Sequence, residues 1–210
     1  MYRKVQFSIF ILILALAGCQ TTGVDKAQKT VQSMNKQFAM LKSVPDSINV
    51  TISSLNDLLK EGGDMRAEFN AFDKNVNNLV KEGEQFSKLK TSIDSSKSAF
   101  VEAWIESQQT TKSDDLLNRS KKRRAAVTEQ FDEMSELVAE VGAEFNPWLQ
   151  EVIDVRTYLE SDLNANGVAS IANVVPKITK ESKSVISKIE DLITELEKLS
   201  NAMTATKTIE

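Results

Sequence analysis

Few residues in this chain have side chains that could do chemistry. The 210 residues include one cysteine, Cys19, and no histidine, against 30 acidic and 26 basic side chains. Without histidine, neither a Ser-His-Asp nor a Cys-His nucleophile can be assembled, and no histidine-liganded metal site can exist. The seven glycines form no P-loop and no Gly-x-Gly-x-x-Gly motif. We therefore expect no enzyme activity, no cofactor and no metal site.

Cys19 follows a segment with the layout of a bacterial secretory signal. Arg3 and Lys4 give a positive start, residues 9–17 form an unbroken apolar run, and small residues follow. A permanent membrane span needs about 20 apolar residues, so this run is short for one. The alternative is a short anchor, or an ordinary signal with an incidental cysteine.

The sequence Leu16-Ala17-Gly18-Cys19 resembles the bacterial lipobox. The resemblance implies transfer of a diacylglyceryl group to the Cys19 sulfur, cleavage between Gly18 and Cys19, and acylation of the new terminus with a fatty acid such as palmitate. Two or more acyl chains make such an anchor stable. Gln20 follows the cysteine, and the resemblance implies sorting to the outer membrane, facing the periplasm. The alternative is the outer face of the plasma membrane.

These features predict the organisation of the whole chain. We expect a signal peptide at 1–18, a lipidated N-terminus and linker at 19–23, a helical domain at 24–205 and a tail at 206–210. Two of the bases lie in 1–18, so 24 bases remain against 30 acids. This acidic balance argues against nucleic acid as a partner. With Cys19 lipidated, no thiol is left for a disulfide.

Apolar residues recur at alternating steps of three and four through four successive segments, the spacing of helices that pack along a seam. The spacing predicts an all-α fold, an elongated antiparallel up-down four-helix bundle with coiled-coil-like packing. Some seams could instead serve an oligomer. The expected seams run from Val24 to Leu59, from Met65 to Trp104, from Val127 to Leu159 and from Ile171 to Met203.

Breaker residues separate the four segments. Gly62-Gly63 should end the first helix, and Asp64 can cap the second. Asp114 and Asp115 suit the start of the third helix, expected over 114–163. Gly167 is available for a left-handed C-cap at the third break.

The three prolines lie within segments of heptad spacing, and each could interrupt a helix. Pro45 and Pro147 each remove a helix hydrogen bond. Because the phase continues across both, we expect kinks at these positions rather than chain reversals. Pro176 lies near the start of the fourth helix, where it disturbs least.

Two lysines and two tryptophans fall on the expected seams. The stems of Lys90 and Lys97 should pack while their amines reach water. The alternative is a polar pocket that takes an anionic ligand. We expect Trp104 and Trp148 to pack in the core rather than to stack on a ligand.

The segment 107–124 is conspicuously basic, with six bases, two acids and a net charge of +4. A solvated helix start explains such a run without any function. Helix one, however, should begin within about 15 Å of the lipidated Cys19. The second helix then returns, so the turn at 110–113 should face the membrane and contact anionic headgroups. The bases are Lys112, Arg119, Lys121, Lys122, Arg123 and Arg124.

Two stretches carry a family resemblance. One is Phe-Val-Glu-Ala-Trp at 100–104 with the polar turn and basic helix start after it. The other is Tyr-Leu-Glu-Ser-Asp-Leu-Asn-Ala-Asn-Gly-Val-Ala-Ser-Ile at 158–171. With the lipobox and the heptads, they resemble an uncharacterised family of bacterial lipoproteins, domain of unknown function 2959. The resemblance implies an all-helical envelope protein and supplies no activity and no site residues.

Two kinds of function fit these observations. The first is a lipid-anchored helical module in the cell envelope that presents its faces to protein partners or spaces envelope components. The second is a binding module for a lipid or another amphiphile, held in the bundle or at its basic tip. Co-purified lipid would favour the second.

Overall fold

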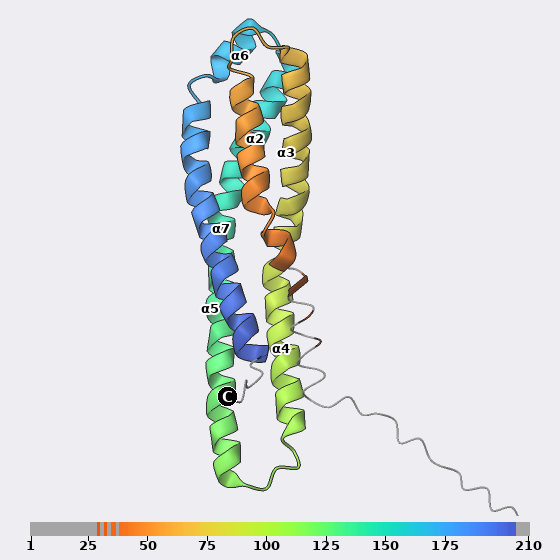
Figure 1. The fold of residues 1–210 in the computed structure, drawn as a ribbon, viewed down its shortest axis with the longest axis vertical. Coiled ribbons are helices and arrows are strands. Elements are labelled where there is room, and N and C mark those ends of the chain that lie inside the picture. Colours follow the sequence, from red (N-terminus) through yellow and green to blue (C-terminus); the bar gives the residue numbers. More distant parts are fainter. Residues whose placement is uncertain (1–28, 30–31, 33–34, 37, 205–210) are drawn as a thin grey trace, which may run out of the picture.

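The computed structural model describes residues 29, 32, 35, 36 and 38–204, with side chains up to Asn201. All regular structure in this part of the chain is helical, which confirms the all-α prediction. The helices are α2 (Val44–Asp57), α3 (Met65–Ser87), α4 (Leu89–Ser107), α5 (Asp114–Ser161), α6 (Ala165–Ile171) and α7 (Val175–Thr204) (Figure 1).

The helices form one elongated body (Figure 1). The 48-residue α5 is about 72 Å long and packs against α7, α4 and α3, while α2 packs against α3 and α7. The α2–α3 turn and α6 lie at one end, which we call the closed end. The α4–α5 turn lies at the other, and we call residues 104–124 the hairpin tip.

The predicted start signals cap the helices as expected. Asp64 is the N-cap of α3, and its carboxylate accepts hydrogen bonds from the backbone N–H groups of Arg66 and Ala67, both at 3.1 Å. Gly62, just before it, has φ +81°, a left-handed conformation that glycine adopts without steric cost. Ser113 is the N-cap of α5, whose first turn holds two aspartates, as predicted.

The helix expected over the second segment is divided at Lys88. The Lys88 backbone N–H bonds the Gln85 carbonyl at 3.1 Å, the tighter i to i−3 pattern. The buried positions Gly83, Phe86 and Leu89 follow at two successive steps of three, where the heptad would have a three and a four. Such an irregularity overwinds a helix locally, which explains the tight turn between α3 and α4.

This shift of phase corrects the predicted seam of α4 in part, because Ile93 and Phe100 are buried as expected but the lysines are not. Leu89 and Ser96 are buried in place of Lys90 and Lys97. The side chains of Lys90 and Lys97 are 52% and 28% exposed, and each amine pairs with a carboxylate, at 3.0 and 2.5 Å. The lysines therefore lie at the edge of the seam and interrupt no core position.

The prolines differ in their effect. Pro45 does not kink a continuous helix, because α2 begins at Val44 and Pro45 lies in its first turn, where a missing N–H costs nothing. The buried residues Leu41 and Val44 are again three positions apart in the sequence. They lie beside the break between α3 and α4. By contrast, α5 continues through Pro147 without a reversal. Pro176 lies at the start of α7, as expected.

The expectation for Gly167 was wrong. Its neighbour Asn164 caps α6, accepting from the backbone of Asn166 and Gly167, and Gly167 lies buried inside that helix. A Cβ atom there would come within 1.9 Å of the Asp162 carbonyl oxygen. Glycine is needed for close approach of two backbone segments and not for a C-cap.

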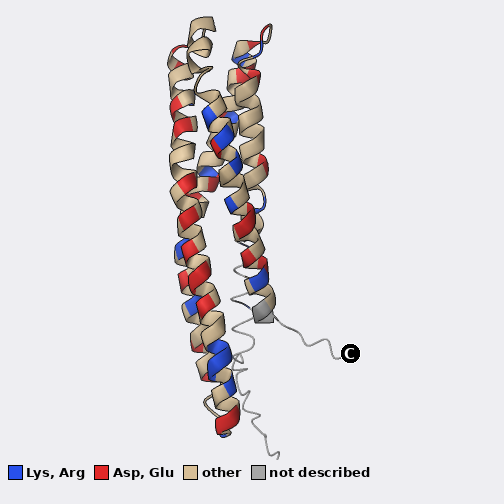
Figure 2. Cartoon of the chain, turned by 90° about the vertical axis from the view of Figure 1, so that its left-hand side faces the viewer, with Lys and Arg blue, Asp and Glu red and all other residues tan. Residues whose placement is uncertain are grey.

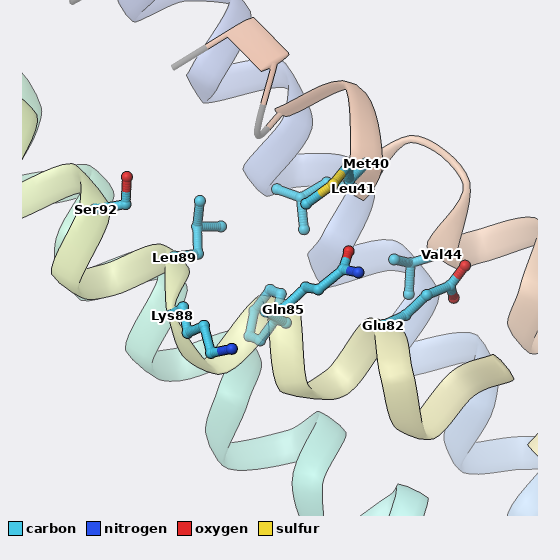
Figure 3. Close-up of a pocket in the computed structure, with 9 residues that line it drawn as sticks. Met40, Leu41, Val44, Glu82, Gln85, Lys88, Leu89 and Ser92 are labelled. Atoms are coloured by element: carbon cyan, nitrogen blue, oxygen red, sulfur yellow. The ribbon is translucent and has the colours of Figure 1, made fainter. Parts of the chain in front are cut away.

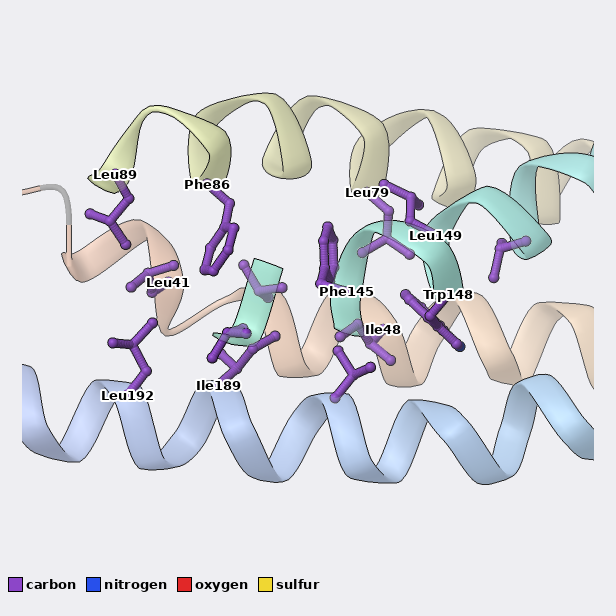
Figure 4. Packing of buried hydrophobic residues seen from close by; sticks show 14 of the residues in the cluster. Leu41, Ile48, Leu79, Phe86, Leu89, Phe145, Trp148, Leu149, Ile189 and Leu192 are labelled. Atoms are coloured by element: carbon purple, nitrogen blue, oxygen red, sulfur yellow. The ribbon is translucent and has the colours of Figure 1, made fainter. Parts of the chain in front are cut away.

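The buried apolar residues form one cluster, part of which is shown in Figure 4. The predicted α5 seam is buried at every position from Val127 to Leu159, and the α7 seam from Val175 to Leu199. Trp148 is 2% exposed and donates its indole N–H to the Ile178 carbonyl at 3.1 Å, which confirms its place in the core. Met203 lies beyond the described side chains.

Candidate functional site

The predicted lipidation site lies outside the described residues. Gly18, Cys19 and the segments 1–18 and 19–23 all precede residue 29, the first that the structure describes. The lipobox prediction therefore stays a prediction. The candidate site that the structure does describe is the hairpin tip.

Local sequence builds the hairpin tip. α4 ends at Ser107, a polar turn follows at 108–113, and Ser113 begins α5 by accepting the Leu116 backbone N–H at 3.4 Å. Leu199, near the end of α7, lies beside Gln130 and Met134. α5 therefore extends beyond the end of α7 to reach the tip, as Figure 1 shows.

The structure brings the six predicted bases together at this end (Figure 2). Arg119 donates to Asp115 at 2.8 Å, but both side chains are more than 70% exposed, so the pair contributes little stability. Within the described residues, Lys112, Lys121 and Lys122 form no ion pair. Arg124, half-buried, lines a shallow surface groove with Lys121. The tip therefore presents several cations without a counter-charge.

Trp104 braces the tip from inside. Its indole N–H donates to the Ser120 hydroxyl at 2.8 Å and ties the end of α4 to the start of α5. The Trp104 ring packs edge-on against Phe100, with centroids 5.3 Å apart, and the Arg123 guanidinium lies 5.6 Å from its centre. Trp104 is only partly buried, so it packs at the edge of the core.

Sequence reasoning missed two apolar side chains at the tip. Ile105 is 48% exposed and Leu116 is 58% exposed, on opposite sides of the same turn. Both lie off the α4 and α5 seams, where Phe100, Ala103 and Val127 are buried. Their off-seam positions beside a basic run were the signal that could have found them.

An apolar cavity of about 170 Å³ lies where α3 meets α4 (Figure 3). It opens at the level where the buried residues Leu41 and Val44, and Phe86 and Leu89, are three positions apart. The two breaks in the heptad spacing therefore face each other. Glu82 stands at its edge, and one carboxylate oxygen accepts from Ser47 at 2.9 Å. The lining residues are Met40, Leu41, Val44, Glu82, Gln85, Phe86, Lys88, Leu89 and Ser92.

The titratable pairs with shifted pKa values lie on the helix surfaces, some between two helices and some, such as Lys90 with Asp94, within one helix. Lys188 of α7 lies 2.5 Å from Glu144 of α5, and this hydrogen bond lowers the pKa of the Glu144 carboxyl and raises that of Lys188. The hydrogen bond from Lys90 likewise lowers the pKa of Asp94. A carboxyl kept ionised by a lysine is a poor general acid, so these pairs read as contacts between surfaces.

Two further tests bear on function. Across the part of the chain that the structure describes, no cluster of three or more His, Cys, Asp or Glu side chains could hold a metal ion. In the same residues, no helix combines the length and apolar character needed to cross a membrane.

Comparison with known proteins gives a family and no activity. Neither curated proteins nor solved structures gave a match. The model of a family described as "Protein of unknown function (DUF2959)" matches residues 17–203, which include every helix from α2 to α6 and nearly all of α7. The chain therefore belongs to the DUF2959 family, as the resemblance of its two stretches implied.

Proposed function

We propose that this protein is a lipid-anchored, non-enzymatic helical module of the bacterial cell envelope, which acts through its surfaces on protein partners or as a spacer. The observation that carries the proposal is the continuous burial of two helix seams. Because the α5 and α7 seams are buried along their lengths, the body offers long outer faces rather than a site for a small substrate. The outer membrane, on its periplasmic side, is the proposed location.

The anchor is the first part to test. Cys19→Ser in the full chain should abolish incorporation of labelled palmitate and release the protein from the membrane fraction. The matched control is Ser98→Cys in a Cys19→Ser background, which restores a thiol at an exposed position without a lipobox. Continued membrane association of the Cys19→Ser chain after signal removal would contradict lipid anchoring.

Partner contact is tested in intact cells. A photo-crosslinking residue is placed at one exposed position on each long helix and at the tip, and products are identified by mass spectrometry. One reproducible protein partner from one face would support the module and locate its surface. Crosslinks to lipid alone would contradict the protein-binding role. The positions are Asn70, Ser98, Ala139, Lys183 and Lys122.

A second candidate function is contact with anionic lipid headgroups through the hairpin tip. The unpaired bases there favour it, because each Lys or Arg near an anionic surface contributes about 1 kcal/mol. Changing Lys121, Lys122, Arg123 and Arg124 to Gln should then weaken binding to anionic vesicles. The matched control changes four exposed lysines away from the tip to Gln, namely Lys74, Lys81, Lys180 and Lys183.

An amphiphile held in the bundle is the other form of this second candidate. The apolar cavity favours it, since a cavity of about 150 Å³ lined by apolar side chains can bind a benzene-sized group. Native mass spectrometry of the purified protein should then show a co-purified lipid. Ser92→Phe, which fills the cavity, should remove that lipid, whereas Ser98→Phe on the exposed face should not.

A further inference from the structure

The hairpin tip combines exposed large apolar side chains with a basic turn, and no other part of the described residues has both. Ile105 and Leu116 are among six large apolar side chains that are exposed, and they are the two that flank a basic turn. Leu116 is the most exposed of the six, at 58%. The six side chains are Met40, Val50, Ile105, Leu116, Tyr158 and Val174.

The position of the tip leaves these side chains accessible. The tip is the end of the long axis, and of the described helices only α4 and α5 reach it (Figure 1). Residues 38–41 lie on the tip side of α2.

The tip is also braced to keep its shape. The Trp104–Ser120 hydrogen bond joins the two helices, and Arg123 lies over the Trp104 ring. Ile105 directly follows the braced tryptophan, and Leu116 donates its backbone N–H to the N-cap Ser113. The two apolar side chains are therefore held by helix ends rather than by a long loop.

We infer that the hairpin tip enters the interface of an anionic bilayer, with Ile105 and Leu116 buried at the boundary between headgroups and acyl chains and the surrounding bases paired with phosphates. Apolar side chains beside a basic face are what binding at such an interface requires, since burial of apolar area adds to the electrostatic attraction. The inference rests on the proposed headgroup contact. It adds the depth to which the tip enters the bilayer and the two apolar side chains that are buried there.

Charge complementarity selects a lipid surface as the occupant. The segment 107–124 has a net charge of +4, whereas the rest of residues 19–210 is acidic. Lys112 lies in the turn between the two apolar residues, and Lys121 and Lys122 lie one to two turns beyond Leu116 along α5, while the two acids of the segment, Asp114 and Asp115, directly precede Leu116. A membrane surface offers negative charge to the bases and an apolar layer below it to the two apolar side chains.

The test uses a chain of residues 20–210, which keeps every residue that the structure describes and contains no cysteine. Leu116→Cys is labelled with the polarity-sensitive dye NBD, and Val50→Cys, equally exposed but on α2, is the matched control. Vesicles contain phosphatidylcholine with 30% phosphatidylglycerol, or phosphatidylcholine alone. We expect the dye at 116 to shift its emission to the blue on the anionic vesicles only, and the dye at 50 to stay unchanged.

A second measurement separates insertion from headgroup contact. Ile105→Ser with Leu116→Ser should weaken partitioning into the anionic vesicles by roughly 10- to 100-fold at any salt concentration, because the lost term is apolar. The control, Val50→Ser with Val174→Ser, should leave it unchanged. The Gln variant at 121–124 should lose binding mainly at low salt, because its lost term is screened.

The outcomes distinguish the two ideas. If the chain binds anionic vesicles but the dye at 116 stays in water and the double Ser variant binds equally well, headgroup contact survives and insertion is wrong. If the chain does not bind the vesicles at all, both ideas fail. Contact with a protein partner would then be the remaining role for Leu116 and Ile105.

Discussion

The two ends of the molecule are built on opposite plans. At the closed end, α2, α3, α5 and α7 meet, α6 joins α5 to α7, and Val168 and Ile171 belong to the core. At the hairpin tip, α4 and α5 are the only described helices that meet, and Val127 is the last seam position of α5 that is buried before the turn. The closed end buries most of its apolar side chains and leaves Tyr158 and Val174 41% and 39% exposed, while the tip leaves Ile105 and Leu116 48% and 58% exposed beside a basic run.

This difference suggests separate roles for the two ends, one in the stability of the fold and the other in contact with other molecules. Burial of apolar area is the main stabilising term in a folded chain, so the closed half should carry most of the free energy of unfolding. The tip contributes fewer buried residues and is free to present charge and apolar surface to something else. Substitutions at matched positions in the two halves test this division.

The largest contrast should come from the two tryptophans. Trp148→Ala removes a 2% exposed ring and its hydrogen bond to Ile178, and we expect a loss of about 3–5 kcal/mol in the free energy of unfolding. Trp104→Ala removes a partly buried ring between two helices, and we expect less than about 2 kcal/mol. Urea unfolding followed by circular dichroism measures both. Equal losses would break the comparison.

Two glycines sharpen the account of the closed half. Gly167→Ala places a Cβ against the Asp162 carbonyl, a backbone atom that cannot easily move, and should cost about 1–3 kcal/mol. Gly142→Ala meets nothing closer than Phe86 at 3.6 Å and should stabilise α5 by about 0.5–1 kcal/mol. Opposite signs in thermal unfolding are the expected result, and destabilisation by both would show that the space beside α5 is tighter than the distances indicate.

The helix caps should give a smaller contrast. Asp64 accepts two backbone hydrogen bonds at 3.1 Å, whereas Ser113 accepts one at 3.4 Å. Asp64→Ala should therefore cost about 1 kcal/mol and Ser113→Ala about 0.5 kcal/mol. Chemical denaturation of the two variants compares them directly. A larger loss at Ser113 would mean that the tip depends on its cap more than the closed end does.

The sequence predicted the parts of the fold that repeat. The seams of α5 and α7 follow an unbroken heptad, and each expected position with a described side chain is buried. Asp64 and Ser113 lie where start signals were visible. In these cases a local rule and the tertiary packing agree, which is why periodicity alone was sufficient.

The errors fall where the repeat is broken. Lys90 and Lys97 were placed on the seam because a step of four was assumed after Phe86, and the structure takes a step of three. Packing against α5 decides between a step of three and a step of four, and the pattern of a single sequence does not contain this information. Gly167 was misread for a related reason, since its small size serves contact with Asp162 and not a local turn.

The candidate site was half visible in the sequence. The basic run was plain from residue types, but its brace, the Trp104–Ser120 hydrogen bond, joins residues 16 apart on two helices. The exposure of Ile105 and Leu116 depends on which faces of α4 and α5 pack against each other, and the phase shifts in α4 but not in α5. The arrangement of the tip therefore depends on packing between α4 and α5, which the residue types alone do not specify.

The smallest effect should come from acid. The hydrogen bond from Lys188 holds the pKa of Glu144 below its ordinary value of 4.5, so the pair stabilises the folded state above that pH and loses its effect as the pH falls through the lower folded value. The difference in Tm between the wild type and Lys188→Gln should therefore shrink as the pH drops from 6 to 3. Both side chains are 38% exposed, so the difference should be small at every pH. The hairpin tip provides the control, because Lys122→Gln removes a base without a carboxylate partner. A pH-dependent difference of the same size for Lys122→Gln would mean that general charge, and not the contact between α5 and α7, sets the acid response.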